Sequence, residues 1–329
     1  MHALGDGVDA VARETGFSGV VAVPGFAAAY GFAHRALRVP NTVDTRFAIA
    51  SGGKGFTALA VVSLVVEGAL QLSTTARSVL GDDLPLVDGA VTVEHLLAHW
   101  SGIGDYIDED AGGEITDYVL PVPVHELTTA SAFLPVLDGH PAKFPPGERF
   151  SYCNSGYALL ALIAERVSRV PFHDLVRQRV CAQAGLPDTD FLRSDELPAR
   201  TALGYLTAHS DRTNVFHLPV LGSGDGGIYS TAADLAMFWR ALFAGAIVPP
   251  VWVREMVRPR SDVPAESRRY GLGFWLHAST DVVMLEGYDA GVSFRSMHDP
   301  RSGATYTVLG NTSDGAWPVV RYLVDRLDA

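Results

Sequence analysis

Ser51 and Lys54, three positions apart, are the residues of this 329-residue chain best suited to chemistry. On one helical turn they project from the same face, so the lysine amine can approach the serine hydroxyl. A serine hydroxyl is a poor nucleophile at neutral pH and needs a base within hydrogen-bond distance. Lysine can supply that base where an apolar setting disfavours its charged form. The pair predicts an acyl-accepting nucleophile, with a helix-capping serine as the alternative.

A tyrosine and an asparagine two positions apart complete this candidate site. Tyr152 offers a phenol that, as tyrosinate beside a charged lysine, could take the serine proton and pass it to a leaving group. Asn154 offers donors and an acceptor suited to holding Lys54 and an amide or carbonyl of the substrate. The residues alone do not decide whether Lys54 or Tyr152 is the general base.

Composition and charge narrow the class of protein. The formal charge is −12 and the chain has no basic run, which argues against a nucleic-acid partner. The longest apolar stretch, residues 55–66, is too short to span a membrane. The first residues lack the pattern of a secretory signal, and the two cysteines suggest no disulfide framework, so we expect a cytoplasmic protein. We expect no cofactor, no bound metal and no membrane partner.

Short strands at both ends and helices in the middle are the elements that must position these residues. Apolar runs flanked by turn residues predict strands, and apolar residues at helical spacing predict helices. We expect two parts in one unit. Residues 1–72 and 265–329 together form an antiparallel sheet with flanking helices, and residues 73–264 form a helical lobe. We predict strands at 17–23, 27–32, 270–276, 281–286, 292–298 and 304–310, and helices at 51–70, 93–100, 124–137, 157–167, 171–184, 231–243 and 317–327.

Five segments in order resemble one family, the serine hydrolases related to class C β-lactamases, DD-peptidases and β-lactamase-like esterases. Residues 47–54 look like its nucleophile segment, and residues 145–157 like the segment that holds a Tyr-x-Asn motif. Residues 93–102, 226–235 and 270–274 also fall in the expected order. The resemblance implies an α+β fold in which an antiparallel sheet flanked by helices joins a helical lobe, with the active site between them.

The third motif of that family departs from its usual form. The family has Lys-Thr-Gly or His-x-Gly, whereas counting back from Gly291 gives Leu285, Glu286 and Gly287, so the cation is missing. The resemblance implies that the oxyanion is held by backbone N–H groups of Ser51 and of the residue after the motif, Tyr288. Arg295 could replace the cation, but a strand partner is the favoured interpretation.

These observations predict a serine hydrolase with an acyl-enzyme on Ser51. Because Leu285 replaces a cation that helps grip a substrate carboxylate, a carboxylesterase acting on small esters or amides is favoured over a β-lactamase. A D-amino-acid peptidase or acyltransferase acting on an ester, amide or lactam is an alternative. A non-catalytic acyl-binding or sensing protein is another. The oligomeric state is not predicted.

Three further groups of residues have structural explanations. His95 and His99 are spaced like metal ligands, but a helix end is favoured because no third ligand is well placed. Cys153 is predicted to point into the core. The acidic cluster at 105–110, made of Asp105, Asp108, Glu109 and Asp110, lacks the spacing of a calcium loop and predicts a solvated loop near the site.

Overall fold

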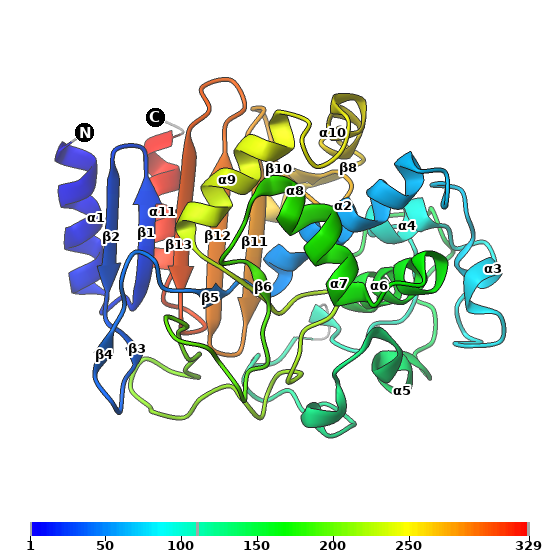
Figure 1. Ribbon diagram of the computed structural model, residues 1–329, viewed down its shortest axis with the longest axis horizontal. Helices are drawn as coiled ribbons and strands as arrows, with labels where there is room; N and C mark the ends of the chain where they lie inside the picture. Colours follow the sequence, from blue (N-terminus) through cyan, green and yellow to red (C-terminus); the bar gives the residue numbers. More distant parts are fainter. Residues whose placement is uncertain (1, 110–111, 328–329) are drawn as a thin grey trace.

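The computed structural model describes residues 2–109 and 112–327, and its largest element is an eight-stranded antiparallel sheet (Figure 1). The strand order is β2-β1-β13-β12-β11-β10-β9-β8, so both ends of the chain share one sheet, as predicted. Its strands are β1 (Gly19–Val23), β2 (Phe26–Tyr30), β8 (Ser261–Val263), β9 (Arg268–Tyr270), β10 (Trp275–His277), β11 (Val283–Asp289), β12 (Val292–His298) and β13 (Thr305–Gly310).

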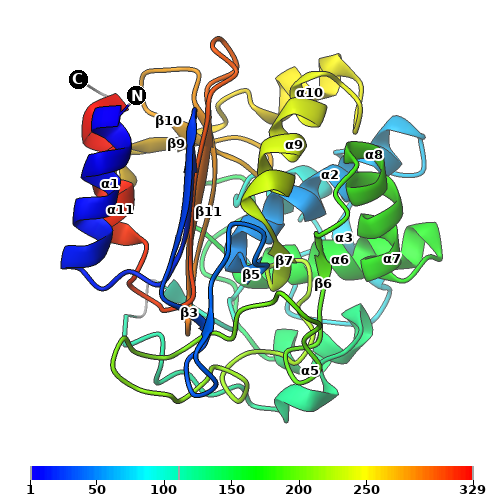
Figure 2. The ribbon, with the colours of Figure 1, turned by 60° about the vertical axis from the view of Figure 1, so that its left-hand side comes forward.

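Helices cover both faces of this sheet (Figure 2). The terminal helices α1 (His2–Glu14) and α11 (Trp317–Leu327) lie on one face, while α2 (Gly53–Val66) and α9 (Ala232–Phe243) lie on the other. Because successive strand residues point to opposite faces, neighbouring residues serve two different cores. Leu285 joins the larger core on the α2 side, and Met284 joins the smaller core beneath α1 and α11. The predicted α+β architecture is confirmed.

A lobe of mostly short helices, cyan to green in Figure 1, packs beside the sheet. Helix α2 runs from the sheet into this lobe and contacts both α6 and β11. Residues 53–64 of α2 are all buried, which explains why the helix is apolar nearly all round. The lobe contains α3 (Ala76–Leu80), α4 (Val93–Leu97), α5 (Leu134–Leu137), α6 (Asn154–Ser168), α7 (Phe172–Val176) and α8 (Ala182–Ala184), and α10 (Pro250–Met256) follows α9.

Two short sheets accompany the large one, and one of them includes the residues before Ser51. In one of them, β5 (Phe47–Ala48) and β6 (Asp190–Phe191) pair with the central strand β7 (Ile228–Ser230). The other is the hairpin of β3 (Phe32–His34) and β4 (Val39–Pro40). The β5–β7 pairing fixes the residues just before Ser51 against the loop that ends at β7. None of the described helices has both the length and the apolar character needed to cross a lipid bilayer.

Two predicted elements differ from the structure. The helix predicted over 124–137 is wrong, because Thr129 is extended and its side chain caps a new turn at Ala132. The segment instead forms η3 (Val124–Glu126), η4 (Ala130–Phe133) and α5. The single strand predicted over 270–276 is also wrong. Gly273, with φ of +88°, turns the chain there, so Trp275 pairs back with Tyr270 across β9 and β10.

The N-terminal helix α1 was not predicted, because its glycines conceal its packing surface. A Cβ on Gly7 would lie 1.7 Å from the Tyr322 hydroxyl, so glycine lets α1 lie directly against α11. Tyr322 is more than 300 positions further along the chain, and no local pattern reveals this contact. The remaining predicted helices and strands are present, several with shifted ends.

Gly287 on β11 permits the closest approach between the sheet and the nucleophile segment. A Cβ there would lie 2.0 Å from the carbonyl oxygen of Ile49 and 3.1 Å from the Ala50 Cβ. Real Cβ atoms do not come that near to backbone, so only glycine lets β11 pack directly on the turn that carries Ser51.

We expect Gly287→Ala to separate β11 from the nucleophile turn. Overpacking against backbone should lower the free energy of unfolding by about 1–3 kcal/mol, measured by urea denaturation. The matched control is Gly89→Ala, because a Cβ at Gly89 meets nothing within 4 Å. This control should change stability by less than about 0.5 kcal/mol. Equal stability of the two variants would contradict the role of Gly287.

Candidate active site

Ser51 lies on a tight turn, η1 (Ala50–Gly52), which leads directly into α2. Ala50 has φ of +43°, a conformation that non-glycine residues adopt at a cost. Gly226 packs on this turn so closely that its Cβ would lie 2.9 Å from the Ala50 carbonyl. The turn is therefore held between Gly226 on one side and Gly287 on the other, and it presents Ser51 at the start of a helix.

Lys54 is 2% exposed, and three acceptors surround its amine. Nζ donates to Ser51 Oγ at 2.9 Å, to Asn154 Oδ1 at 2.8 Å and to the carbonyl oxygen of Asp225 at 2.7 Å. An ammonium has three N–H donors, so these bonds use all of them. When the amine loses a proton, its lone pair can face Ser51 and accept the hydroxyl proton.

Burial lowers the pKa of Lys54 from its ordinary value of 10.5. Nearby carboxylates, first Asp225 and then Glu109, oppose this shift, because a negative charge favours the ammonium form. The geometry therefore supplies a lysine that loses its proton more easily than a surface lysine and lies within reach of Ser51.

Tyr152 lies beside the pair with its ring packed between other aromatic rings. Its ring centroid is 4.4 Å from that of His99 and 5.9 Å from that of Trp275, with the Trp275 ring stacked nearly parallel. Burial raises the pKa of Tyr152 well above its ordinary value, and a hydrogen bond with Ser51 opposes the shift. Lys54 Nζ lies 4.9 Å from the centre of the Tyr152 ring. Near neutral pH, Tyr152 is therefore a phenol in contact with the nucleophile.

His99 packs against the ring of Tyr152 and is a neutral imidazole. Its Nδ1 accepts the backbone N–H of Cys153 at 3.0 Å, so Nε2 carries the proton and faces the Tyr270 hydroxyl at 3.2 Å. Burial lowers the pKa of His99 well below its ordinary value. His95 closes the capping box of α4 with Thr92. Both imidazoles therefore hold the fold together, and Cys153 is buried, as predicted.

Asn154 is fixed by a buried carboxylate on the facing loop. Asp105 accepts the backbone N–H groups of Asn154 at 2.7 Å and Ser155 at 2.8 Å, which caps the start of α6. The Asn154 side chain holds Lys54 with its oxygen and donates from Nδ2 to the carbonyl oxygen of Ile107 at 3.1 Å. The carboxylate thus sets the position of Tyr152 and Asn154 relative to Lys54.

The solvated-loop prediction for the acidic cluster at 105–110 is wrong for Asp105, which is 8% exposed. Two N–H donors at a helix start stabilise a buried carboxylate, and sequence spacing does not show them. Asp108 pairs with Lys143 at 2.6 Å, and Glu109 is exposed and lies 3.3 Å from Asn154 Nδ2. Asp110 lies outside the described residues.

The third-motif residues occupy three different environments. The Leu285 side chain is buried against α2, where a Cβ on Gly55 would lie 2.6 Å from it. Glu286 points to the opposite face and pairs with Arg268 at 2.8 Å and with Arg295. Arg295 is thus a strand partner behind the sheet and supplies no cation to the cleft.

Tyr288 is placed to offer its N–H to the site. Asp289 pairs with Val292 across a two-residue turn, and Tyr288 pairs with Ser293. Because hydrogen-bonded and non-hydrogen-bonded pairs alternate in an antiparallel ladder, the Tyr288 N–H points away from β12. Tyr288 also lies close to Ser51, because both residues line the same two pockets.

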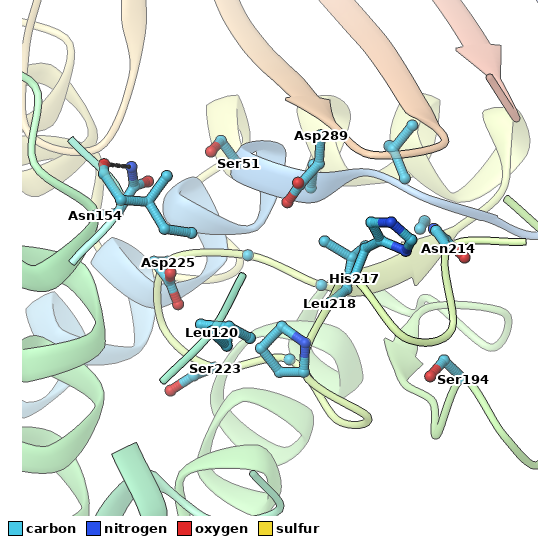
Figure 3. Close-up of a pocket in the computed structure, with 18 of the residues that line it drawn as sticks. Ser51, Leu120, Asn154, Ser194, Asn214, His217, Leu218, Ser223, Asp225 and Asp289 are labelled. Atoms are coloured by element: carbon cyan, nitrogen blue, oxygen red, sulfur yellow. Dashed lines mark hydrogen bonds between the residues drawn. The ribbon is translucent and has the colours of Figure 1, made fainter. Parts of the chain in front are cut away.

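Two pockets open on either side of Ser51. The Tyr152 pocket is lined by Ser51, Tyr152, Trp275, Gly287 and Tyr288, among others. The Asp225 pocket, shown in Figure 3, extends from Ser51 over the loop before β7. Its lining includes Ser51, Tyr106, Leu120, Asn154, Ser194, Asn214, His217, Leu218, Ser223, Asp225, Tyr288, Asp289 and Val292.

Sequence reasoning missed the two aspartates of the Asp225 pocket. Asp225 lies one residue before the Gly226-Gly227 pair of a recognised segment, and Asp289 follows Tyr288. Their positions beside known motifs were the available signal. Tyr106 donates to a carboxylate oxygen of Asp225, and burial raises the pKa of both aspartates, that of Asp289 to about 7.

Comparison with known proteins agrees with this fold. A family model described as Beta-lactamase matches residues 21–327, so the chain belongs to the β-lactamase family, whose members are serine hydrolases. Esterase EstB of Burkholderia gladioli is 27% identical, with 81% of this chain and 76% of the esterase covered. Penicillin-binding protein 4* of Bacillus subtilis is also 27% identical, with 80% of this chain covered.

A solved structure gives the same result at the level of the fold. The penicillin-binding protein from Bacillus halodurans superposes with a TM-score of 0.89 at 36% identity, covering 97% of this chain and 99% of that one. The chain spans 59% of the length of penicillin-binding protein 4*.

We expect Asp105→Asn to disturb the start of α6. An amide NH₂ would face one of the two N–H donors, so the free energy of unfolding should fall by about 1–3 kcal/mol. Displacement of Asn154 and Tyr152 should lower ester hydrolysis at least about tenfold. Asp108→Asn is the matched control, because it removes a partly exposed ion pair worth about 0–1 kcal/mol. If both variants behave alike in urea denaturation and in the ester assay, Asp105 does not position the site.

Proposed function

We propose that this chain is a serine hydrolase that forms an acyl-enzyme on Ser51, with carboxylesterase-type activity on small esters or amides. The observation that carries the proposal is the buried Lys54 amine, 2.9 Å from Ser51 Oγ. Tyr152 and Asn154 complete the set around that pair, and the family consists of serine hydrolases.

In the first half of the reaction, neutral Lys54 accepts the proton of Ser51 while Oγ attacks the carbonyl carbon. The carbonyl electron pair moves onto oxygen, where the N–H groups of Ser51 and Tyr288 stabilise the negative charge. The bond to the leaving group then breaks as Tyr152 gives it the phenolic proton, and the Lys54 ammonium returns a proton to Tyr152. Water attacks the acyl-enzyme in the same way and releases the acid.

The pKa shifts favour Lys54 over Tyr152 as the base. Burial lowers the pKa of Lys54, which promotes its basic form, and raises the pKa of Tyr152, which promotes its acidic form. Environments that push two pKa values in opposite directions assign the acid and base roles. Tyr152 also lines the Tyr152 pocket, so that pocket receives the leaving group and the Asp225 pocket receives the acyl group.

Leu285 supports an ester over a β-lactam substrate. Its buried side chain faces α2, where the related motif supplies a cation for a substrate carboxylate. The arginines nearest in the sheet, Arg268 and Arg295, are paired with Glu286 behind it. The third-motif position and these two arginines therefore offer no cation to a substrate carboxylate.

Replacement of the nucleophile is the direct test. Wild-type protein should hydrolyse short p-nitrophenyl esters and should be labelled at Ser51 by a fluorophosphonate, detected as a mass adduct on the peptide that contains Ser51. Ser51→Ala should lose the label and at least about a thousandfold in kcat/KM while unfolding at the same urea concentration. Absence of both hydrolysis and labelling in the wild type would refute the proposal.

The pH dependence tests the choice of base. Because the neutral amine is the active form, kcat/KM for ester hydrolysis should rise with pH and level off with a midpoint below the ordinary lysine pKa of 10.5. Lys54→Arg keeps the positive charge but holds its proton, so its rate should be about 10²–10⁴-fold lower over the same range. A midpoint above 10.5, or an active Lys54→Arg variant, would favour tyrosinate as the base.

A further inference from the structure

Two carboxylates, Asp225 and Asp289, face the acyl-side pocket and interact with Lys54 through space. Asp225 and Asp289 come from different elements, the loop before β7 and the end of β11, and both lie beside Ser51 in the Asp225 pocket (Figure 3). Asp225 accepts the Tyr106 hydroxyl, and Asp289 accepts the N–H of Ala290 at 2.8 Å. Within residues 2–109 and 112–327, neither forms a salt bridge with lysine or arginine, although both remain partly exposed to the pocket.

Polar atoms without partners line the same pocket. Ser223 is 3% exposed, and its Oγ has no hydrogen-bond partner. The Oγ of Ser194 and the Nδ1 of His217 are also buried and without a partner. Most buried polar atoms in folded proteins are hydrogen-bonded, so these residues add unused hydrogen-bonding capacity to the wall of the pocket. Apolar side chains, Leu120, Leu218 and Val292, line the same pocket.

We propose that the Asp225 pocket selects acyl groups that carry an ammonium close to the reacting carbonyl, as aminoacyl esters and amides do, with Asp225 and Asp289 as its partners. This proposal rests on the proposed function, because it concerns the acyl half of the same reaction. The ammonium would donate charge-assisted hydrogen bonds to the two carboxylates while the apolar walls hold the rest of the acyl group.

A cationic acyl group would also favour the active form of the base. Burial disfavours the charged forms of Asp225 and Asp289, and a bound ammonium compensates for that cost. The carboxylates of Asp225, Glu109, Asp105 and Asp289 all favour the ammonium form of Lys54. A substrate ammonium on two of these carboxylates offsets their effect and favours neutral Lys54. An anionic acyl group would meet only repulsion from them.

The experiment compares p-nitrophenyl esters that differ by one group. Alanyl and isobutyryl esters have the same shape, with an ammonium in the first where the second has a methyl. Both alanyl enantiomers are assayed near pH 7, below the α-amino pKa of about 7.7–8. Each kcat/KM is divided by the spontaneous hydrolysis rate, which removes the difference in intrinsic reactivity. At least one alanyl ester should exceed the isobutyryl ester by about tenfold or more.

Variants that each remove one carboxylate charge test which residues cause the preference for an ammonium-bearing acyl group. Asp225→Asn and Asp289→Asn should each lower the alanyl-to-isobutyryl ratio by about tenfold. Asp82→Asn removes the same charge at an exposed residue outside the pocket and should keep the ratio. Should a pocket variant fail to fold, competition in the wild type replaces it. Alaninamide should inhibit isobutyryl ester hydrolysis at a concentration at least about tenfold lower than isobutyramide does.

The outcomes separate the two proposals. Suppose first that Ser51-dependent hydrolysis of the isobutyryl ester is seen. The ammonium proposal alone is then overturned by an alanyl-to-isobutyryl ratio at or below one, or by a ratio that is unchanged in Asp225→Asn and Asp289→Asn. Equal inhibition by the two amides would overturn it as well. If no ester is hydrolysed and no fluorophosphonate labels Ser51, the proposed function fails, and the ammonium proposal fails with it.

Discussion

The site depends on removing one lysine amine from water. Lys54 is surrounded by three acceptors from three separate segments: the turn before α2, the start of α6 and the loop before β7. Burying the Lys54 ammonium without hydrogen-bond partners would cost too much free energy. A direct ion pair with a carboxylate would instead hold the proton on the amine by raising its pKa. Neutral acceptors avoid both problems. They satisfy the amine and leave it able to give up its proton, while the carboxylates that favour its charge interact through space without a direct ion pair.

Close backbone contact is the second requirement, and glycine provides it. Gly226, from the loop before β7, and Gly287, from β11 of the sheet, both contact the turn of Ala50 and Ser51. They approach it at distances that a Cβ atom would prevent. Within this closely packed turn, Ala50 has a positive φ. The sheet side of this contact also places Tyr288, the residue after Gly287, beside the turn that carries Ser51.

Charge divides the cleft into two dissimilar halves. On the Tyr152 side, a phenol is stacked on Trp275 and supported by a neutral His99. On the Asp225 side, two aspartates line the pocket with three residues that carry a buried polar atom without a hydrogen-bond partner among the described residues. The family's usual cation is absent, because Leu285 is part of the core and the nearby arginines are neutralised by Glu286. The third-motif position therefore supplies no cation, and the two aspartates line the pocket on the Asp225 side.

The sequence by itself determined the architecture and the choice of candidate site residues. Alternation located β12, helical spacing located α11, and the ordered motifs led to Ser51, Lys54, Tyr152 and Asn154, which the fold brings together around one amine. These features are legible because their spacing within one turn, strand or segment carries the information.

Only the tertiary structure decided the rest. It buried Asp105, which spacing alone had assigned to a solvated loop, and it turned Arg295 away from the cleft. It also brought Asp225 and Asp289 together from segments more than 60 positions apart. The physical reason is that burial, pKa and charge depend on neighbours from distant parts of the chain, and local spacing does not specify those neighbours.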